Sequence, residues 1–299
     1  MSEIHTIHHN NSHVPVLLEA VLDTLQPQPG ETYLDLTAGY GGHARAVLAN
    51  VGASSLVTLV DRDEQAIAAL QDLKDAGARV IKSDYLRAAQ TLKDNAESFD
   101  LILMDIGVSS PHLDKPERGF SFQTEGPLDM RMDQSAGITA SQLIDSSSEE
   151  ELIRILREYG QEPRARVIAR ALVEARPLRT TLELAQLVEK TIGRRGKTHP
   201  ATRTFQALRI AVNDELKQLE HALPLVLDIL RPGGRVAVIS FHSLEDRLVK
   251  QFFKNEAEGG YEARIKLITK KPRSGATEDV FNRRARSAKL RAAIKINIK

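Results

Sequence analysis

The segment Thr37-Ala38-Gly39-Tyr40-Gly41-Gly42-His43-Ala44 decides the fold, because it places three glycines directly after a short apolar run. Glycine lets the backbone turn sharply and lets a ligand approach it closely. A strand, a glycine turn and a helix in this order are typical of ligand sites in α/β proteins, although such a turn alone is a weak signal. The segment even fits a loosened dinucleotide fingerprint, so NAD is an alternative ligand at this point.

Similar apolar runs flank this segment, and each ends in or close to an aspartate. They cover residues 33–36, 56–61, 79–81 and 101–105. Continuous short apolar runs are typical of buried parallel strands, and helical patterns lie between them. The alternation predicts an α/β fold with a doubly wound sheet. Residues 236–240 are expected to form a fifth buried strand, and residues 263–269 and 290–296 two edge strands.

The alternation stops after Asp105, and a loop region is followed by helical patterns only. Helices are expected at residues 148–159, 163–175, 181–192, 200–230 and 244–253. The long fourth pattern is predicted to break near Pro224, and Arg231-Pro232-Gly233-Gly234 is a stop signal. The predicted domains are a core of residues 1–111 and 213–299 and an inserted helical domain of residues 112–212.

Charge distinguishes between the two ligand classes. In open α/β sheets ligands bind at the carboxyl ends of the strands, where the aspartates at 35, 61, 84 and 105 fall. Carboxylates repel a pyrophosphate, but they attract S-adenosylmethionine, which carries a sulfonium and an ammonium. We therefore expect Asp61 to accept the ribose hydroxyls and Asp35 to pair with the ammonium. Asp84 or Tyr85 would bracket the adenine, and Asp84 is equally well explained as a helix N-cap.

Composition excludes several other classes of function. The chain has no cysteine, so thiolate nucleophiles, iron–sulfur clusters and cysteine zinc sites are excluded. With 41 Lys and Arg against 40 Asp and Glu, a nucleic-acid surface has to come from local clusters. No signal peptide or membrane span is apparent, so a cytoplasmic protein without membrane contact is expected. The histidines at positions 5, 8, 9 and 13 are interpreted as a mobile tail, and no metal is expected.

The sequence resembles the MraW (RsmH) type of small-subunit ribosomal RNA cytosine-N4 methyltransferases from end to end. The resemblance is carried by the blocks at residues 13–18, 41–43, 61–63, 105–111, 117–122, 126–132, 199–207, 240–247 and 284–291. It implies a class I Rossmann-like methyltransferase core with an inserted helical domain. It also implies methyl transfer from S-adenosylmethionine to N4 of a cytidine. The implied partner is small-subunit ribosomal RNA, in the assembled subunit, and the enzyme is expected to be a monomer or a homodimer.

By position, the resemblance assigns the cofactor contacts to Gly41, Gly42, His43, Asp61, Tyr85, Asp105 and His112. The candidate catalytic residues are Asp105, Ser109 and Ser110, which follow the fourth strand and would accept the hydrogens of the amine. The two serines are equally well explained as caps of a turn.

Residues that contact RNA are expected in the matched blocks and in basic clusters. The candidates are Arg131, Arg195 and Arg203, and the clusters lie at residues 194–197, 270–273 and 283–286. Phe120 and Phe122 are candidates for a target-base pocket or for ordinary packing, and His242 for a base contact or a structural role. The alternatives are methylation of another RNA or DNA base amine, and a non-catalytic ribosome-assembly factor.

Overall fold

The computed structural model describes residues 15–107, 114–194, 196 and 198–296. The strands are β1 (Tyr33–Asp35), β2 (Val57–Asp61), β3 (Arg79–Lys82), β4 (Phe99–Asp105), β5 (Leu230–Ser240), β6 (Ile265–Leu267), β7 (Arg273–Ser274) and β8 (Lys289–Lys295). The first helices are α1 (Leu18–Leu25), α2 (Gly42–Val51), α3 (Glu64–Ala69), α4 (Gln71–Asp75) and α5 (Tyr85–Asp94). The later ones are α7 (Ala140–Ser146), α8 (Glu149–Glu158), α9 (Ala165–Glu174), α10 (Thr181–Ile192), α11 (Thr202–Asn213), α12 (Glu215–Ile229), α13 (Ser243–Ala257) and α14 (Gly275–Glu278).

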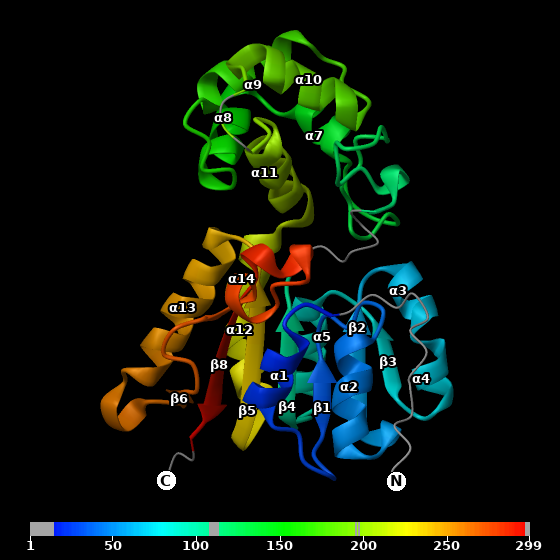
Figure 1. Ribbon diagram of the computed structural model, residues 1–299, viewed down its shortest axis with the longest axis vertical. Coiled ribbons are helices and arrows are strands. Elements are labelled where there is room, and N and C mark those ends of the chain that lie inside the picture. The colour runs from blue at the N-terminus through cyan, green and yellow to red at the C-terminus, as the bar shows by residue number, and fades with distance from the viewer. Residues whose placement is uncertain (1–14, 108–113, 195, 197, 297–299) are drawn as a thin grey trace.

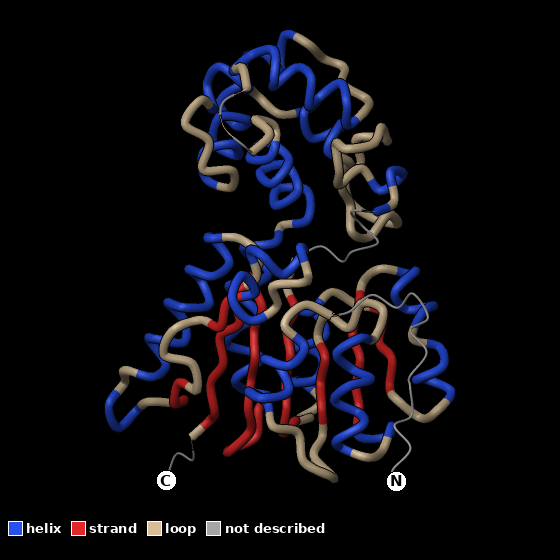
Figure 2. The backbone as a smooth tube through the Cα atoms, viewed as in Figure 1, coloured by secondary structure: helices blue, strands red, loops and turns tan. Residues whose placement is uncertain are grey.

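The strands form one sheet in the order β3-β2-β1-β4-β5-β8-β6, with β7 also paired to β8. The first five of these are parallel, and β8 is antiparallel to both of its neighbours in this order. Figure 2 shows the strands side by side in red. The strand order reverses between β1 and β4, which is where ligands bind in doubly wound folds. The predicted Rossmann-like α/β sheet is therefore confirmed. The prediction of two edge strands was half wrong, because β8 is an interior strand and only β6 lies at the edge.

Helices cover both faces of the sheet (Figure 1). Alternate residues of β4 show why, since Leu101 and Leu103 pack into one apolar cluster while Ile102 and Met104 pack into the other. The first cluster joins the sheet to α1 and α2, and the second joins it to α5, α12 and α13. A strand buried on both faces reads as a continuous apolar run, which is the pattern of residues 101–104.

Helices α7 to α11 gather beyond the carboxyl ends of the strands (Figure 1). They enclose a third apolar cluster, whose buried members run from Phe120 to Leu208. Among the described residues, no helix combines the length and the apolar character needed to cross a bilayer.

The predicted break of the long helix near Pro224 was wrong. The break lies at Asp214, whose φ is 49° and which separates α11 from α12, while Pro224 lies inside α12. Aspartate tolerates the left-handed conformation better than most residues. Pro224 is on the exposed side of α12, where water can bond the carbonyl that loses its N–H partner. Helix α12 ends at Ile229, and residues 231–234 form an irregularity at the start of β5.

Candidate active site

A cavity of about 1080 Å³ lies between the carboxyl ends of the strands and the inserted helices. The sheet contributes one wall, here called the sheet wall, which includes Gly39, His43, Asp61, Tyr85 and Asp105. The opposite wall, the helix wall, includes Phe120, Phe122, Phe205, Gln206 and Arg209. Five of the predicted cofactor residues therefore line one cavity, namely Gly42, His43, Asp61, Tyr85 and Asp105.

The glycine turn is tied to Asp61 across 22 positions of sequence. The Gly39 N–H donates to Asp61 Oδ2 at 2.8 Å, and the Asp63 N–H donates to Oδ1 at 2.8 Å. Gly41 has a φ of 79° and caps α2, and a Cβ on Gly42 would lie 2.4 Å from Pro15 Cγ. Gly42 lines the cavity itself, whereas Gly41 supplies the turn behind it. Carboxylate oxygens have further lone pairs, so Asp61 can still accept ligand hydroxyls.

His43 and Asp105 face each other at the end of β4. His43 Nε2 lies 3.5 Å from Asp105 Oδ2, and the Asp105 N–H donates to Thr37 Oγ1 at 2.6 Å. Asp105 Oδ1 and both ring nitrogens of His43 are buried, and within the described part of the chain they have no hydrogen-bond partner. Buried polar atoms without partners are costly. A polar ligand in the cavity would satisfy such atoms.

Two neighbouring residues at the start of α5 also line the cavity. Asp84 caps the helix, because its carboxylate accepts the Arg87 N–H at 2.8 Å, so the N-cap interpretation is confirmed. Tyr85 is largely buried, and its hydroxyl donates to the Glu215 carbonyl at 3.1 Å. Burial raises the pKa of Tyr85 well above its ordinary value. The phenol is therefore a neutral group that anchors α5 to α12.

Asp35 is packed beneath the cavity and is 2 % exposed. Its carboxylate accepts from the Tyr33 hydroxyl at 2.9 Å and from the Thr37 N–H at 3.1 Å. Burial raises the pKa of Asp35 to about 6, and the nearby Asp105 carboxylate adds to the rise. Asp35 is not among the residues that line the cavity, and its expected contact with a ligand ammonium stays a prediction. The aspartates that line the cavity are Asp61, Asp63, Asp84 and Asp105.

Sequence reasoning missed a buried charge cluster at the junction of α11, α12 and α13. Arg209 donates to both carboxylate oxygens of Glu215, at 2.8 and 2.7 Å, and lies 3.8 Å from Glu245 Oε1. Glu245 Oε2 accepts the N–H groups of Phe241 and His242. The His242-x-x-Glu245 spacing matches the reciprocal pattern of a capping box, which is the signal that could have revealed half of this cluster.

The same cluster has the composition of a metal site but holds a cation of its own. Ligand atoms of Glu215, His242 and Glu245 lie within 4.8 Å of one another. The Arg209 guanidinium already supplies positive charge to Glu215 in a bidentate pair, which is a strong arrangement. His242 caps α13 and lines the cavity, so both interpretations of this residue describe part of its position.

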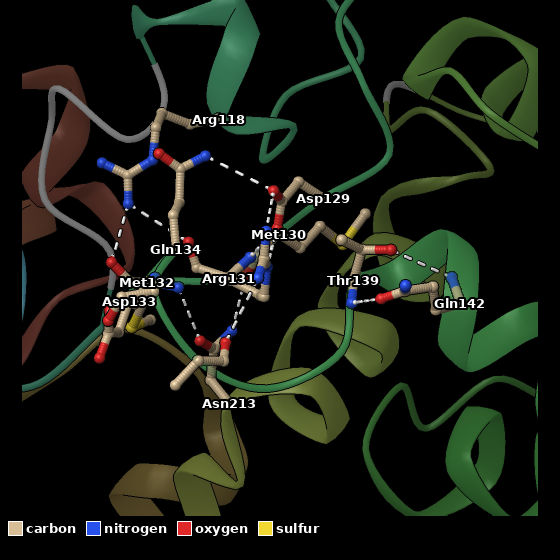
Figure 3. A network of polar contacts seen from close by, with 12 residues as sticks. Arg118, Asp129, Met130, Arg131, Met132, Asp133, Gln134, Thr139, Gln142 and Asn213 are labelled. Atoms are coloured by element: carbon tan, nitrogen blue, oxygen red, sulfur yellow. Dashed lines mark hydrogen bonds and ion pairs between the residues drawn. The ribbon is translucent and has the colours of Figure 1, made fainter.

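The loop at residues 118–134 is attached to the core through Arg118, and Figure 3 shows the polar contacts within this loop. The Arg118 side chain is 2 % exposed and donates to Asp63 Oδ2 at 2.8 Å, and also to the carbonyls of Arg131 and Met132. Asn213 bonds the same loop, because its Oδ1 accepts the Met132 N–H and its Nδ2 donates to the Met130 carbonyl. These bonds connect the turn after β2 to both ends of the inserted segment.

The helix wall is aromatic. Phe122 packs against Phe205 with ring centroids 4.8 Å apart and against His199 at 4.6 Å. Phe120 and Phe122 both line the cavity and both belong to the apolar cluster of the inserted helices. The packing interpretation of these rings is confirmed, and their role in a target-base pocket stays a prediction.

The remaining predicted site residues lie elsewhere. Ser109, Ser110, His112 and Arg195 are outside the described residues, as are the histidines at positions 5, 8, 9 and 13. Arg131 forms a bidentate pair with Asp129, and Arg203 is exposed and donates to the Gln161 carbonyl. Neither arginine lines the cavity, and their role in RNA binding stays a prediction.

Known proteins resemble this chain along most of its length. Residues 10–296 match the MraW methylase family. The chain belongs to this family. Among its relatives, the ribosomal RNA small subunit methyltransferase H of Heliobacterium mobile is 45% identical over 309 residues, which covers 95% of this chain and 99% of the relative. The protein of the same name from Synechocystis sp. is 47% identical over 296 residues, covering 95% and 93%.

Membership of the MraW methylase family confirms the resemblance seen in the sequence blocks. An rRNA methylase from Streptococcus thermophilus has a solved structure that shares 11% identity with this chain and a TM-score of 0.44, covering 96% of this chain and 100% of that one. A likeness at that level carries no functional argument. The family membership rests on the sequence matches, and the Rossmann-like topology on the strand order given above.

Proposed function

We propose that this MraW-family protein transfers a methyl group from S-adenosylmethionine to N4 of a cytidine in small-subunit ribosomal RNA. The observation that carries the proposal is the pair of carboxylates, Asp61 and Asp105, that line a cavity beside a glycine turn. The names of the relatives specify a methyltransferase of small-subunit ribosomal RNA. The choice of cytidine N4 follows from the resemblance of the sequence blocks.

The residues of the sheet wall fit a cationic methyl donor. Asp105 Oδ1 is buried and lacks a hydrogen-bond partner among the described residues, so it is suited to a ligand ammonium or amine. A Cβ on Gly39 would meet only the Thr37 carbonyl oxygen, at 4.0 Å. When bound there, S-adenosylmethionine would supply an electrophilic methyl group on a sulfonium. Its proposed contacts are Gly41, Gly42, His43, Asp61, Tyr85, Asp105 and His112.

The chain would contribute mainly positioning and a hydrogen acceptor. The amine of cytosine is a weak nucleophile because its lone pair is delocalised into the ring. Holding the reacting groups in line can lower a barrier by ~7–11 kcal/mol. Asp105 is the proposed acceptor of the amine hydrogen, because its carboxylate lines the cavity; Ser109 and Ser110 follow it in the sequence. The absence of cysteine excludes a thiolate adduct on the base.

The inserted segment is the proposed RNA-recognition domain, with residues 112–212 as its predicted range. Its aromatic wall faces the cofactor side across the same cavity, so an extruded base would meet rings on one side and carboxylates on the other. Extruding a base costs least in single-stranded or irregular RNA. The assembled small subunit is the proposed substrate, and Arg131, Arg195 and Arg203 are proposed to contact its phosphates.

Two experiments test this function. Thermal unfolding with S-adenosylmethionine or NAD should show stabilisation by S-adenosylmethionine alone, because only a ligand that binds the native state shifts the transition. Incubation of isotope-labelled S-adenosylmethionine with small subunits from cells that lack the enzyme should place the label on N4 of a cytidine, as located by mass spectrometry. Label on carbon C5, or on another nucleoside, would contradict the proposal. Binding to the subunits without any label would indicate an assembly factor instead.

A further inference from the structure

A short segment near the C-terminus is held in a defined conformation against the N-terminal part of the chain. The Asp279 carboxylate accepts the Leu17 N–H at 2.9 Å, and the Asn282 N–H donates to the Asp279 carbonyl at 3.1 Å. Gly275 and Ala285 touch so closely that a Cβ on Gly275 would lie 1.9 Å from the Ala285 carbonyl oxygen. The segment from Gly275 to Ala285 is therefore fixed at both ends by their close contact, and the bond from Leu17 to Asp279 fixes the turn within it.

This turn presents Phe281 to solvent, with 99 % of its surface exposed. Of the large apolar side chains that the structure shows exposed in its described ranges, Phe281 is the only aromatic one. Exposing a phenyl ring forfeits the favourable free energy of its burial. A single exposed apolar side chain needs no explanation by itself, so the surroundings of Phe281 decide its meaning.

Arginines follow Phe281 directly in the sequence, at positions 283, 284 and 286, and all three are exposed. Arg284 pairs with Asp114, and it lines the cavity together with Ser287. Arg283 and Arg286 have no ion pair with any residue that the structure describes. In Figure 1, α14 lies at the end of the sheet that faces the inserted helices. The exposed ring and the free guanidinium groups are thus part of a segment that reaches the cavity.

We propose that Phe281 is a stacking platform for an unpaired base of the RNA substrate, flanked by Arg283 and Arg286 as phosphate contacts. Proteins that bind single-stranded nucleic acid combine positive charge along the backbone with aromatic rings on which bases stack. A turn held at both ends presents its ring without a further loss of conformational freedom. The proposal rests on the proposed function, and it adds a residue that positions the strand which leads into the cavity.

The absence of tryptophan from the chain makes a direct test possible. The variant F281W contains a single tryptophan, so fluorescence excited selectively at that ring reports on its surroundings alone. Titration with a single-stranded RNA of the substrate sequence should quench this fluorescence, because a stacked base contacts the ring. The matched control is A49W near the end of α2, where Ala49 is exposed and does not line the cavity, and its fluorescence should not change. Unquenched F281W fluorescence, while labelled RNA in the same titration shows binding, would overturn the proposal.

Affinity supplies an independent measurement. Phe281→Ala should weaken binding to unmethylated small subunits by about 5- to 100-fold in Kd, and Phe281→Tyr should restore most of it. Thermal stabilisation by S-adenosylmethionine should be unchanged in both variants. If Phe281→Ala weakens binding to assembled subunits but not to protein-free RNA, the ring contacts a ribosomal protein and the proposal is wrong. If the unaltered enzyme methylates no cytidine N4, the proposed function itself is wrong. If the unaltered enzyme does so and Phe281→Ala binds the subunits normally, only the inference about Phe281 is wrong.

Discussion

On the sheet wall of the cavity, backbone N–H groups hold a carboxylate in place, as Gly39 and Asp63 hold Asp61. On the helix wall, ring contacts hold the lining residues, as Phe205 and His199 hold Phe122. The first wall is built from strand ends that are neighbours in one sheet. The second comes from helices that enclose an apolar cluster of their own and bond to the core through Arg118 and Asn213.

This difference indicates a division of labour. Carboxylates in fixed positions suit a small ligand with a permanent positive charge. An aromatic wall that belongs to the separate apolar cluster of the inserted helices suits a base that enters from a large RNA. The contacts that join the two walls are then as important for methyl transfer as the residues of either wall. Variants in the sheet wall, in the junction and in the helix wall should therefore fail in different ways.

The largest effect is expected in the sheet wall, from Asp105→Ala. Loss of the hydrogen acceptor should lower turnover by about 10²–10⁴-fold, measured in single-turnover methylation with saturating S-adenosylmethionine. The matched control is Asp100→Asn on the same strand, because Asp100 pairs with Arg231 outside the cavity. Full turnover by Asp105→Ala with normal cofactor binding would remove Asp105 from the chemistry.

The junction should respond in stability. Arg118→Met leaves the buried Asp63 carboxylate without its 2.8 Å partner, and breaking a buried ion pair costs about 3–5 kcal/mol in the free energy of unfolding. The control is Arg170→Met, whose pair with Glu174 is exposed and should contribute about 1 kcal/mol or less. Urea denaturation measures both values. Equal losses of unfolding free energy in the two variants would show that burial does not determine the contribution of the Arg118–Asp63 pair to stability.

Asp35 should make stability depend on pH. Burial raises its pKa from 3.8 to about 6, so the native state keeps this proton over a range in which the unfolded chain has lost it. The native state is therefore progressively penalised as the pH rises from about 4 to 6. Asp35→Asn lacks this titration, and its free energy of unfolding relative to wild type should rise by about 2–3 kcal/mol between pH 4 and pH 7. Without ligand, denaturation at the two pH values tests this, and a constant difference would contradict it.

The smallest effect is expected in the helical part, from Arg203→Gln. Arg203 is exposed, and a lost phosphate contact reduces the slope of log affinity against log salt by about 0.7–0.9. Binding to small subunits at several salt concentrations measures the slope. Arg154→Gln, on α8 and in ion pairs with Glu151 and Glu158, is the control and should leave the slope unchanged. A salt profile that is flat for the unaltered chain would exclude phosphate contacts by these arginines.

The fold was largely predictable because its signals are local. Apolar runs of three to six residues predicted β1 to β5, and helix α10 was expected at residues 181–192, where it is found. The errors arose where neighbours in space decide. Pro224 is tolerated inside α12 because it faces water, and β8 is an interior strand because β6 pairs with its outer edge. Neither the exposure of Pro224 nor the pairing of β6 with β8 can be inferred from the spacing of residues in the sequence.

The candidate site divides in the same way. Residues Gly42, His43, Asp61, Tyr85 and Asp105 were predictable, because strand ends and a glycine turn of a parallel sheet must meet at one edge. Arg209, Glu215 and Glu245 were not, because three separate helices bring them together. The partners of Asp35 were not predictable from its place at the end of β1. The Tyr33 hydroxyl and the Thr37 N–H both donate to its buried carboxylate.

The sequence by itself determined the sheet, the glycine turn and the family, since these depend on residue types at short and regular spacing. Tertiary structure alone decided which acids line the cavity, how Arg118 joins the inserted helices to the core, and that Phe281 lies in water. The physical reason is that burial and charge pairing depend on distances between residues far apart in the chain, and those distances exist only once the helices have packed.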